Sequence, residues 1–219
     1  MSEMKIVHVN ELAEVLSVPS HLFTPPIPNA EPMTQYDWNG TYVEMAISKL
    51  QKTYTEPNTH IAFLGHVDVW IVLAMAYGLE QNCKCYFASL NHDENNTFTY
   101  IPLNRMPIGT PSGEVYFSYK MKEDGDTVYM DYTVDDPAVQ GHTFFHESIS
   151  KLVLPEIPAG KRLCLHGGGI YPVQWVVTNT YEHVSKSVFT AAHEDIEYTC
   201  AWSDDLRYKV GDRVPRLKL

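Results

Sequence analysis

Two short segments of the chain place glycine beside histidine or an acidic residue, directly after a predicted buried strand. They read Leu64-Gly65-His66-Val67-Asp68 and His166-Gly167-Gly168-Gly169. Glycine lets the backbone pass close to a ligand, and the first turn of a following helix offers unpaired N–H groups and a partial positive charge. This pattern predicts a site for a small anion such as a phosphate. A tight turn without a ligand is the alternative, and the doubling of the pattern favours the ligand. The candidate ligand-binding residues are Gly65, His66, Asp68, Gly167, Gly168 and Gly169.

A histidine beside acidic residues follows the next predicted strand in each half of the chain. The two clusters are His92-Asp93-Glu94 and His193-Glu194-Asp195. Open α/β sheets bind ligands at the carboxyl ends of their parallel strands, where both clusters are expected. Histidine transfers protons near neutral pH, and a carboxylate can orient it or help bind a metal. A solvated turn is the alternative. The candidate catalytic residues of these clusters are His92, Asp93, His193 and Glu194.

The elements that must position these residues follow a β-α-β pattern. Residues 61–64 and 85–90 are apolar runs typical of buried strands, and residues 68–79 between them predict a helix. A β-α-β unit is right-handed and places its two strands parallel in one sheet. Further predictions are strands over 6–9 and 98–101, a helix over 42–50, and a helix over 10–16 capped by Asn10.

The second half of the chain repeats this order. Ile149-Ser150-Lys151-Leu152 copies Ile47-Ser48-Lys49-Leu50, and strands are predicted over 162–165 and 187–191. The helical run between these strands holds Trp175, as the first half holds Trp70, and both are expected in the core. We therefore predict an internal duplication.

A linker and a hairpin separate the two repeats. The segment from Pro102 to Gly113 contains three prolines and two glycines, which marks a domain boundary. We place it so that the domains are 1–108 and 109–219. Residues 115–121 and 127–134 flank the turn-forming Glu123-Asp124-Gly125-Asp126 and predict a β-hairpin. The predicted fold class is α/β, with two tandem domains and an added hairpin.

Charge and composition exclude several classes of protein. The chain has 219 residues, with 16 Lys+Arg against 27 Asp+Glu and a net charge of −11. Coating of nucleic acid needs a cationic surface, so we do not expect it. The longest apolar run, residues 69–77, is about half of the ~20 residues that span a bilayer, so we expect no membrane partner.

The cysteines and the N-terminus bear on location and on metal binding. No signal peptide is recognisable, so we expect a cytoplasmic protein with reduced thiols. Cys83-x-Cys85 is half of a zinc-site pattern, but no second pair stands near it in the sequence. We therefore do not assign a metal site to these cysteines.

The segment from Leu154 to Gly168, with Pro172 and Trp175 after it, resembles the small CRISPR-associated ring nucleases of type III systems. Their pattern is a Leu-Pro segment, a strand, a glycine, and then Pro and Trp opening a helix that ends in His. His183 stands at that helix end, and Gly65 and Trp70 match the pattern in the first half. Asp68 stands there in place of the family's Pro.

The resemblance implies a small Rossmann-like domain that works as a dimer and that binds and linearises cyclic oligoadenylate. This chain would then be a fused pair, a pseudo-dimer, with His183 as a further catalytic residue; a favourable interaction with the helix dipole is the alternative role of His183. A divalent metal such as Mn²⁺ is a candidate cofactor without assigned ligands, and a homodimer is left open.

The sequence also departs from the family pattern at the ends of the second strands. The family has Asp followed by Arg there, whereas this chain has Ser89-Leu90 and Ala191-Ala192. A sensor or sponge that binds the ring without cleaving it is therefore an alternative. A third hypothesis is an assembly protein without a small-molecule site, which would show an exposed apolar patch, for example around Pro25–Pro32.

Overall fold

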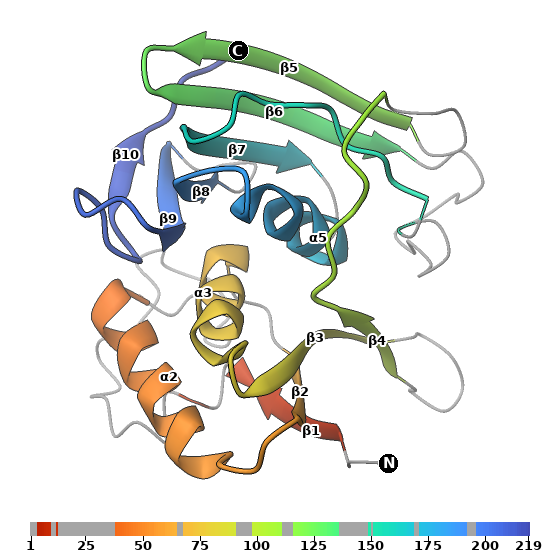
Figure 1. Cartoon of the computed structure of the whole chain (residues 1–219), viewed down its shortest axis with the longest axis vertical. Coiled ribbons are helices and arrows are strands. Elements are labelled where there is room, and N and C mark those ends of the chain that lie inside the picture. The colour runs from red at the N-terminus through yellow and green to blue at the C-terminus, as the bar shows by residue number, and fades with distance from the viewer. Residues whose placement is uncertain are drawn as a thin grey trace, which may run out of the picture. The chain divides into compact units, whose positions relative to one another are not determined.

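The computed structural model divides the chain into two compact units, Met1–Leu103 and Asn104–Leu219. Each unit contains one mixed β-sheet and at least one helix, which confirms the α/β class (Figure 1). The structure describes residues 4–9, 12, 38–64, 68–90, 98–110, 116–135, 149, 151–168, 171–191 and 196–219. Of the predicted helix over 10–16, only Leu12 lies within these ranges. Its Asn10 cap and the Pro25–Pro32 segment lie outside them.

The first unit has a four-stranded sheet in the order β1-β2-β3-β4. Its strands are β1 (Met4–His8), β2 (Thr59–Leu64), β3 (Cys83–Leu90) and β4 (Phe98–Pro102). The first three strands are parallel, and β4 is antiparallel to β3. The parallel pairing predicted for the two strands of the β-α-β unit is therefore confirmed.

Two helices of the first unit pack closely against each other. Helix α2 (Gly40–Thr53) begins after Asn39, whose side-chain oxygen accepts a hydrogen bond from the Tyr42 N–H at 3.1 Å. Helix α3 (Val69–Leu79) is apolar and buried around most of its circumference. A Cβ atom added to Gly78 of α3 would lie 2.7 Å from Ile47 Cδ1 of α2, so glycine permits this close approach.

The second unit has a six-stranded sheet in the order β10-β9-β8-β7-β6-β5. Its strands are β5 (Tyr116–Asp124), β6 (Thr127–Asp135), β7 (Arg162–Gly168), β8 (Ser187–Ala191), β9 (Glu197–Ser203) and β10 (Arg213–Pro215). Strands β6, β7 and β8 are parallel, whereas β5, β9 and β10 are antiparallel to their neighbours. Helix α5 (Tyr171–Glu182) connects β7 to β8.

The predicted hairpin is present, but its second strand has a further role. Strands β5 and β6 pair over their whole length around Gly125, which has a φ of 55°. Strand β6 also pairs with β7 in parallel, so it is the first of three parallel strands rather than an addition to the sheet. The order β6-β7-β8-β9, with α5 before β8, thus repeats the order β1-β2-β3-β4, with α3 before β3.

Both faces of the second sheet bury apolar residues. On the face opposite α5, one cluster consists of Cys164, Phe189, Ala191, Tyr198 and Cys200, with Tyr129, Tyr208 and Val214 packed against it. Tyr208 and Val214 come from the segment that follows β9, so this C-terminal segment covers part of that face. The predicted burial of Trp70 and Trp175 is confirmed, since both side chains are buried.

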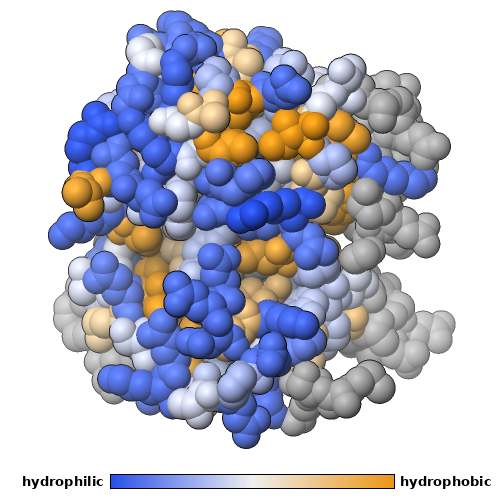
Figure 2. Space-filling view, in the orientation of Figure 1, coloured by the Kyte–Doolittle hydropathy of each residue, from blue (hydrophilic) through white to orange (hydrophobic). Residues whose placement is uncertain are grey.

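The visible surface of both units is mostly hydrophilic (Figure 2). The large hydrophobic residues that are exposed within the described ranges are Met45, Tyr119, Met121, Ile196 and Leu206. Within those ranges, no helix combines the length and apolar character that crossing a bilayer requires.

Candidate functional site

The predicted site in the first unit lies between the end of β2 and the start of α3. Strand β2 ends at Leu64 and α3 begins at Val69, so a helix N-terminus follows a parallel strand there as the sequence predicts. Gly65 and His66 lie outside the described residues. Asp68 occupies the N-cap position, and its backbone oxygen accepts a hydrogen bond from Ile71 N–H at 3.0 Å.

The position of Asp68 affects what this helix end can bind. Its side chain is exposed and makes no capping hydrogen bond. A carboxylate there is favoured by the positive end of the helix dipole. An anionic ligand at α3 would therefore share that positive end with the Asp68 carboxylate.

The glycine run of the second unit is placed differently from the prediction. The sequence predicts that the strand ends at residue 165 and that the glycines form a loop, whereas β7 continues through Gly167 and Gly168. Gly167 pairs with Tyr132 of β6, and a Cβ atom at Gly167 would lie 2.1 Å from Tyr132 Cζ. Gly167 thus makes room for a buried tyrosine ring. Gly169 lies outside the described residues.

His183 is not brought together with the glycines of its own unit. It is exposed and directly follows α5, whose twelve residues begin at Tyr171. At 1.5 Å per residue, the helix separates its two ends by about 18 Å. His183 therefore lies at the amino ends of the strands, whereas Gly167 and Gly168 lie at the carboxyl end of β7.

The remaining candidate catalytic residues follow the strands that the sequence predicts, but their own positions are not described. Strand β3 ends at Leu90, and β8 ends at Ala191. His92, Asp93, His193 and Glu194 come after these ends and lie outside the described residues. Their role stays a prediction.

A group of polar residues that the sequence did not reveal lies on the face of the second sheet opposite α5. We call His166, Asp131 and Arg216 the His166 cluster. Arg216 Nη2 lies 3.1 Å from His166 Nδ1, and Asp131 Oδ1 lies 3.3 Å from the same nitrogen. The side chains of His166 and Asp131 are 10% and 23% exposed. One imidazole nitrogen thus faces both a cation and an anion.

The register of the sheet explains how two of these residues meet. His166 on β7 pairs with Asp131 on β6, and side chains of paired residues project from the same face. Arg216 directly follows β10, and its N–H donates to the Ile196 oxygen at 3.0 Å. The one sequence signal for this cluster was His166 at the end of a predicted strand. The strand register and the return of the C-terminal segment were not evident.

The surroundings of the cluster are apolar enough to disfavour charge on neighbouring groups. Burial raises the pKa of the Cys164 thiol to about 12. The pKa of Tyr198 is also raised, first by burial and then by the nearby Cys164 and Asp131, while Arg216 opposes this rise. Both groups therefore remain protonated at neutral pH.

The cysteines do not support a metal centre. Cys83, Cys85, Cys164 and Cys200 are all free and buried. Burial raises the pKa of the Cys85 thiol to about 12, so this thiol is neutral at neutral pH. Among the residues that the structure describes, no three His, Cys, Asp or Glu side chains are grouped to hold a metal ion.

Comparison with known proteins identified no match to the chain, either among protein-family models or among curated proteins.

Proposed function

We propose that the protein binds cyclic oligoadenylate, the second messenger of type III CRISPR defence, and linearises it. The observation that carries this proposal is the repeated strand order, in which β1-β2-β3-β4 of the first unit corresponds to β6-β7-β8-β9 of the second. A cyclic oligonucleotide has internal symmetry, so two related units offer equivalent binding positions. The resemblance of residues 154–175 to ring nucleases supports the same ligand.

The repeated helix position supports an anionic ligand in particular. In each unit a helix begins shortly after the second parallel strand: α3 after β2, and α5 after β7. The N–H groups of a helix's first turn are unpaired within the helix and carry partial positive charge. Such groups can hold phosphates even in a chain with a net charge of −11. We propose that the two units act as a tandem Rossmann-like pseudo-dimer in the cytoplasm, and two chains pairing into a homodimer is a further proposal.

Ring opening needs in-line attack on a phosphate by the adjacent ribose 2′-OH or by water. Holding the ring in the right geometry supplies much of the catalysis, and hydrogen-bond donors stabilise the charge that develops. His92 with Asp93, and His193 with Glu194, are the proposed proton-transfer residues, with His183 as a further one.

Binding without cleavage is the second candidate function. One observation favours it: β8 ends at Ala191, where the family has an acidic residue. A protein with this arrangement would act as a sensor or sponge for the ring.

One experiment separates these functions. The full chain is incubated with cyclic tri- and tetra-adenylate, with linear tetra-adenylate as control, with and without Mn²⁺. The melting temperature reports binding, and chromatography of the nucleotides reports linear products. A ligand that binds only the native state at 100 times its Kd stabilises it by about 2.7 kcal/mol. Binding with products that His193→Ala removes supports the nuclease, and binding without products supports the sensor. No shift with either ring would refute both.

A further inference from the structure

Arg162 begins strand β7 on the face of the second sheet opposite α5. Its register partners are Thr127 on β6 and Ser187 on β8, whose side chains project from the same face. The guanidinium Nε and Nη2 donate to Thr127 Oγ1 at 3.0 and 2.6 Å, and Nη1 donates to the Tyr208 hydroxyl. The Arg162 Cζ also lies 4.9 Å from the Tyr208 ring centroid and 5.9 Å from that of Phe189. Neighbouring side chains therefore fix the position of this guanidinium.

Within the described residues, Arg162 makes no ion pair with a carboxylate. Three other arginines of the second unit, Arg105, Arg207 and Arg213, contact a carboxylate at 2.9, 2.6 and 3.8 Å. A guanidinium has five N–H groups, and the hydrogen bonds of Arg162 to hydroxyl groups use three of them. A partly buried cation costs free energy unless it is paired. Arg162 is therefore suited to pair with an anion from outside the chain.

The hydroxyl groups around Arg162 have protons of their own to donate. A guanidinium only donates, so the Tyr208 oxygen accepts from Arg162, and its O–H proton is directed to another acceptor. Burial raises the pKa of Tyr129, whereas Arg162 and a hydrogen bond from Thr127 oppose this rise. Because Thr127 donates to the Tyr129 oxygen, the Tyr129 proton is also directed elsewhere. Two phenol protons and two guanidinium protons thus lie close to one another.

Ser187 adds a buried hydroxyl beside Arg162. Its side chain is fully buried, and its Oγ has no hydrogen-bond partner within the described part of the chain. Buried polar atoms are nearly always hydrogen-bonded, so an exception calls for an explanation such as a bound ion. An acceptor oxygen on a ligand at Arg162 would satisfy this hydroxyl.

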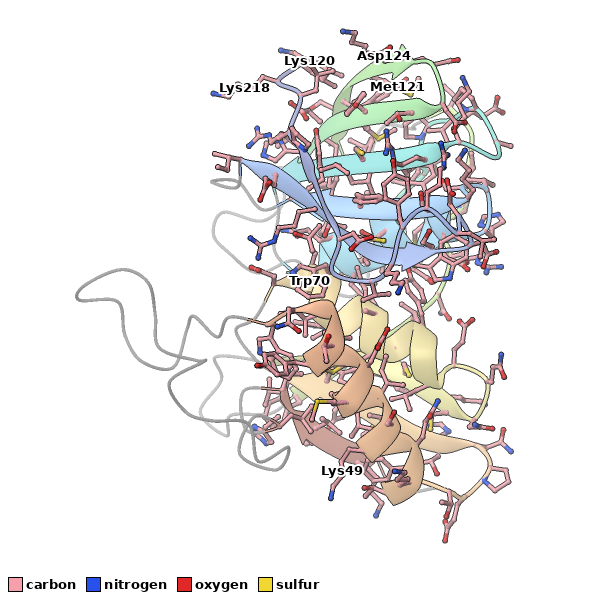
Figure 3. The ribbon with its side chains drawn as sticks, turned by 90° about the vertical axis from the view of Figure 1, so that its left-hand side faces the viewer. Lys49, Trp70, Lys120, Met121, Asp124 and Lys218 are labelled. Atoms are coloured by element: carbon pink, nitrogen blue, oxygen red, sulfur yellow. The ribbon has the colours of Figure 1, made fainter. Side chains whose placement is uncertain are left out.

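Cationic side chains outnumber anionic ones on this face of β5, β6 and β7 within the described residues. Those that project from it are Lys120, Lys122, Asp124, Asp131 and Arg162. Lys122 lies opposite Tyr129, and neither Lys120 nor Lys122 forms an ion pair in the described ranges. Figure 3 shows Lys218, near the C-terminus, close to Lys120. This face therefore gathers positive charge in a chain whose net charge is −11.

We propose that Arg162, Tyr129 and Tyr208 form a binding site for a tetrahedral oxyanion such as a phosphate group, with Lys122 at its rim. The donors come from β6, from β7 and from the loop between β9 and β10, and a tetrahedral anion accepts hydrogen bonds from several directions at once. Arginine suits phosphate because its N–H groups match adjacent oxygens. The site lies at the amino end of β7, whereas the helix starts proposed to hold the ring follow carboxyl ends of strands. It is therefore a second site, independent of the proposed function.

Titration of the full chain with inorganic phosphate, followed by NMR, tests this site. The reporters are the Nε–H signal of Arg162 and the backbone amides of Thr127 and Ser187, with the ionic strength held constant by sodium chloride. We expect saturable shifts of these signals, which phosphate bound only at the starts of α3 and α5 would not cause. Acetate, a planar anion with fewer acceptor oxygens, should bind at least tenfold more weakly.

Two variants and one control make the test decisive. Tyr208→Phe keeps the ring against Arg162 and removes one donor, so the Kd for phosphate should rise about tenfold or more, as for the loss of a hydrogen bond to a charged group. Arg162→Met should abolish the shift of the Thr127 amide. Arg213→Met is the matched control and should leave the Kd unchanged, since Arg213 pairs with Glu197. The absence of saturable shifts in the wild type, an unchanged Kd in either variant, or equal affinity for acetate would overturn the proposal.

Discussion

Gly167 stands opposite Tyr132 in the second sheet, and the tyrosine ring fills the space that a side chain at position 167 would need. The ring atoms Cζ and Cε1 lie 2.1 and 2.4 Å from an ideal Cβ position. Tyr132 also stacks on Phe117, with ring centroids 5.5 Å apart, and is 4% exposed. The ring is therefore held on several sides and has little room to move.

This relationship predicts the effect of Gly167→Ala. The added methyl group must displace the Tyr132 ring or the β7 backbone, and overpacking of this kind costs about 1–3 kcal/mol. We expect the free energy of unfolding, measured by urea denaturation, to fall by that amount. Gly109→Ala is the control, because its Cβ would lie 3.8 Å from Val153 in ordinary contact. Equal stability of both variants would contradict the packing role of Gly167.

The N-terminus of α2 gives a second prediction. Asn39 accepts a hydrogen bond from the Tyr42 N–H, and loss of such a cap costs about 0.5–2 kcal/mol. We expect Asn39→Ala to lower the free energy of unfolding of the first unit by about 1 kcal/mol. Asn39→Asp, which keeps a capping oxygen, should retain most of the stability. A loss as large with aspartate as with alanine would argue against the cap.

The four buried thiols should react slowly in the native protein. Burial raises the pKa of Cys85, Cys164 and Cys200 to about 12 and also raises that of Cys83, so few thiolates exist at pH 8. A colorimetric disulfide reagent should modify four thiols promptly in denaturant and none promptly in buffer. Fast modification of one thiol without denaturant would show that its burial is not maintained.

An ion-pair network joins the hairpin turn to the loop after β9. Asp126 binds Lys186 and Arg207, and Asp205 binds Arg207. Hydrogen bonds from Lys186 and then Arg207 lower the pKa of Asp126, and a hydrogen bond from Arg207 lowers the pKa of Asp205. A carboxyl with a lowered native pKa stabilises the fold above its unfolded pKa of about 3.9, and this contribution is lost as the pH falls through the native value.

The corresponding prediction concerns the stability of the protein at low pH. The urea midpoint of the wild type should fall between pH 5 and pH 2.5, and it should fall less in a variant with Asp126→Asn and Asp205→Asn. Glu156→Gln, at an exposed position of the same unit, serves as control and should keep the wild-type slope. High salt should reduce the difference, because the Asp126 and Arg207 side chains are 53% and 60% exposed. Identical pH slopes in the double variant and the wild type would show that the network contributes nothing.

Several elements could be predicted because their signals are local. Apolar runs bounded by turn residues predict β2, β3 and β8, and the charged turn around Gly125 predicts the β5–β6 hairpin. The extent of β7 could not be predicted, because a glycine run is typical of loops unless a neighbouring strand supplies a large side chain such as Tyr132. That neighbour is set by strand register, which depends on tertiary packing.

The candidate site shows the same division between local and long-range information. The start of α3 near Asp68 follows from local pattern. The contact between His166 and Arg216 spans fifty positions of sequence and depends on the C-terminal segment returning across the sheet. No local pattern around Arg216 indicates a partner on β7. Sequence reasoning therefore found the ends of elements but not the polar cluster that the folded sheet assembles.

The division of the strands between the two units has a consequence for where the chain can be cut. Every described sheet pairing stays within Met1–Leu103 or within Asn104–Leu219. A gene split between these segments would sever no pairing of the described strands, and two co-expressed polypeptides would each retain a complete sheet. Strands β5 and β10 extend the shared four-strand order only in the second unit, so the two units differ by these two strands.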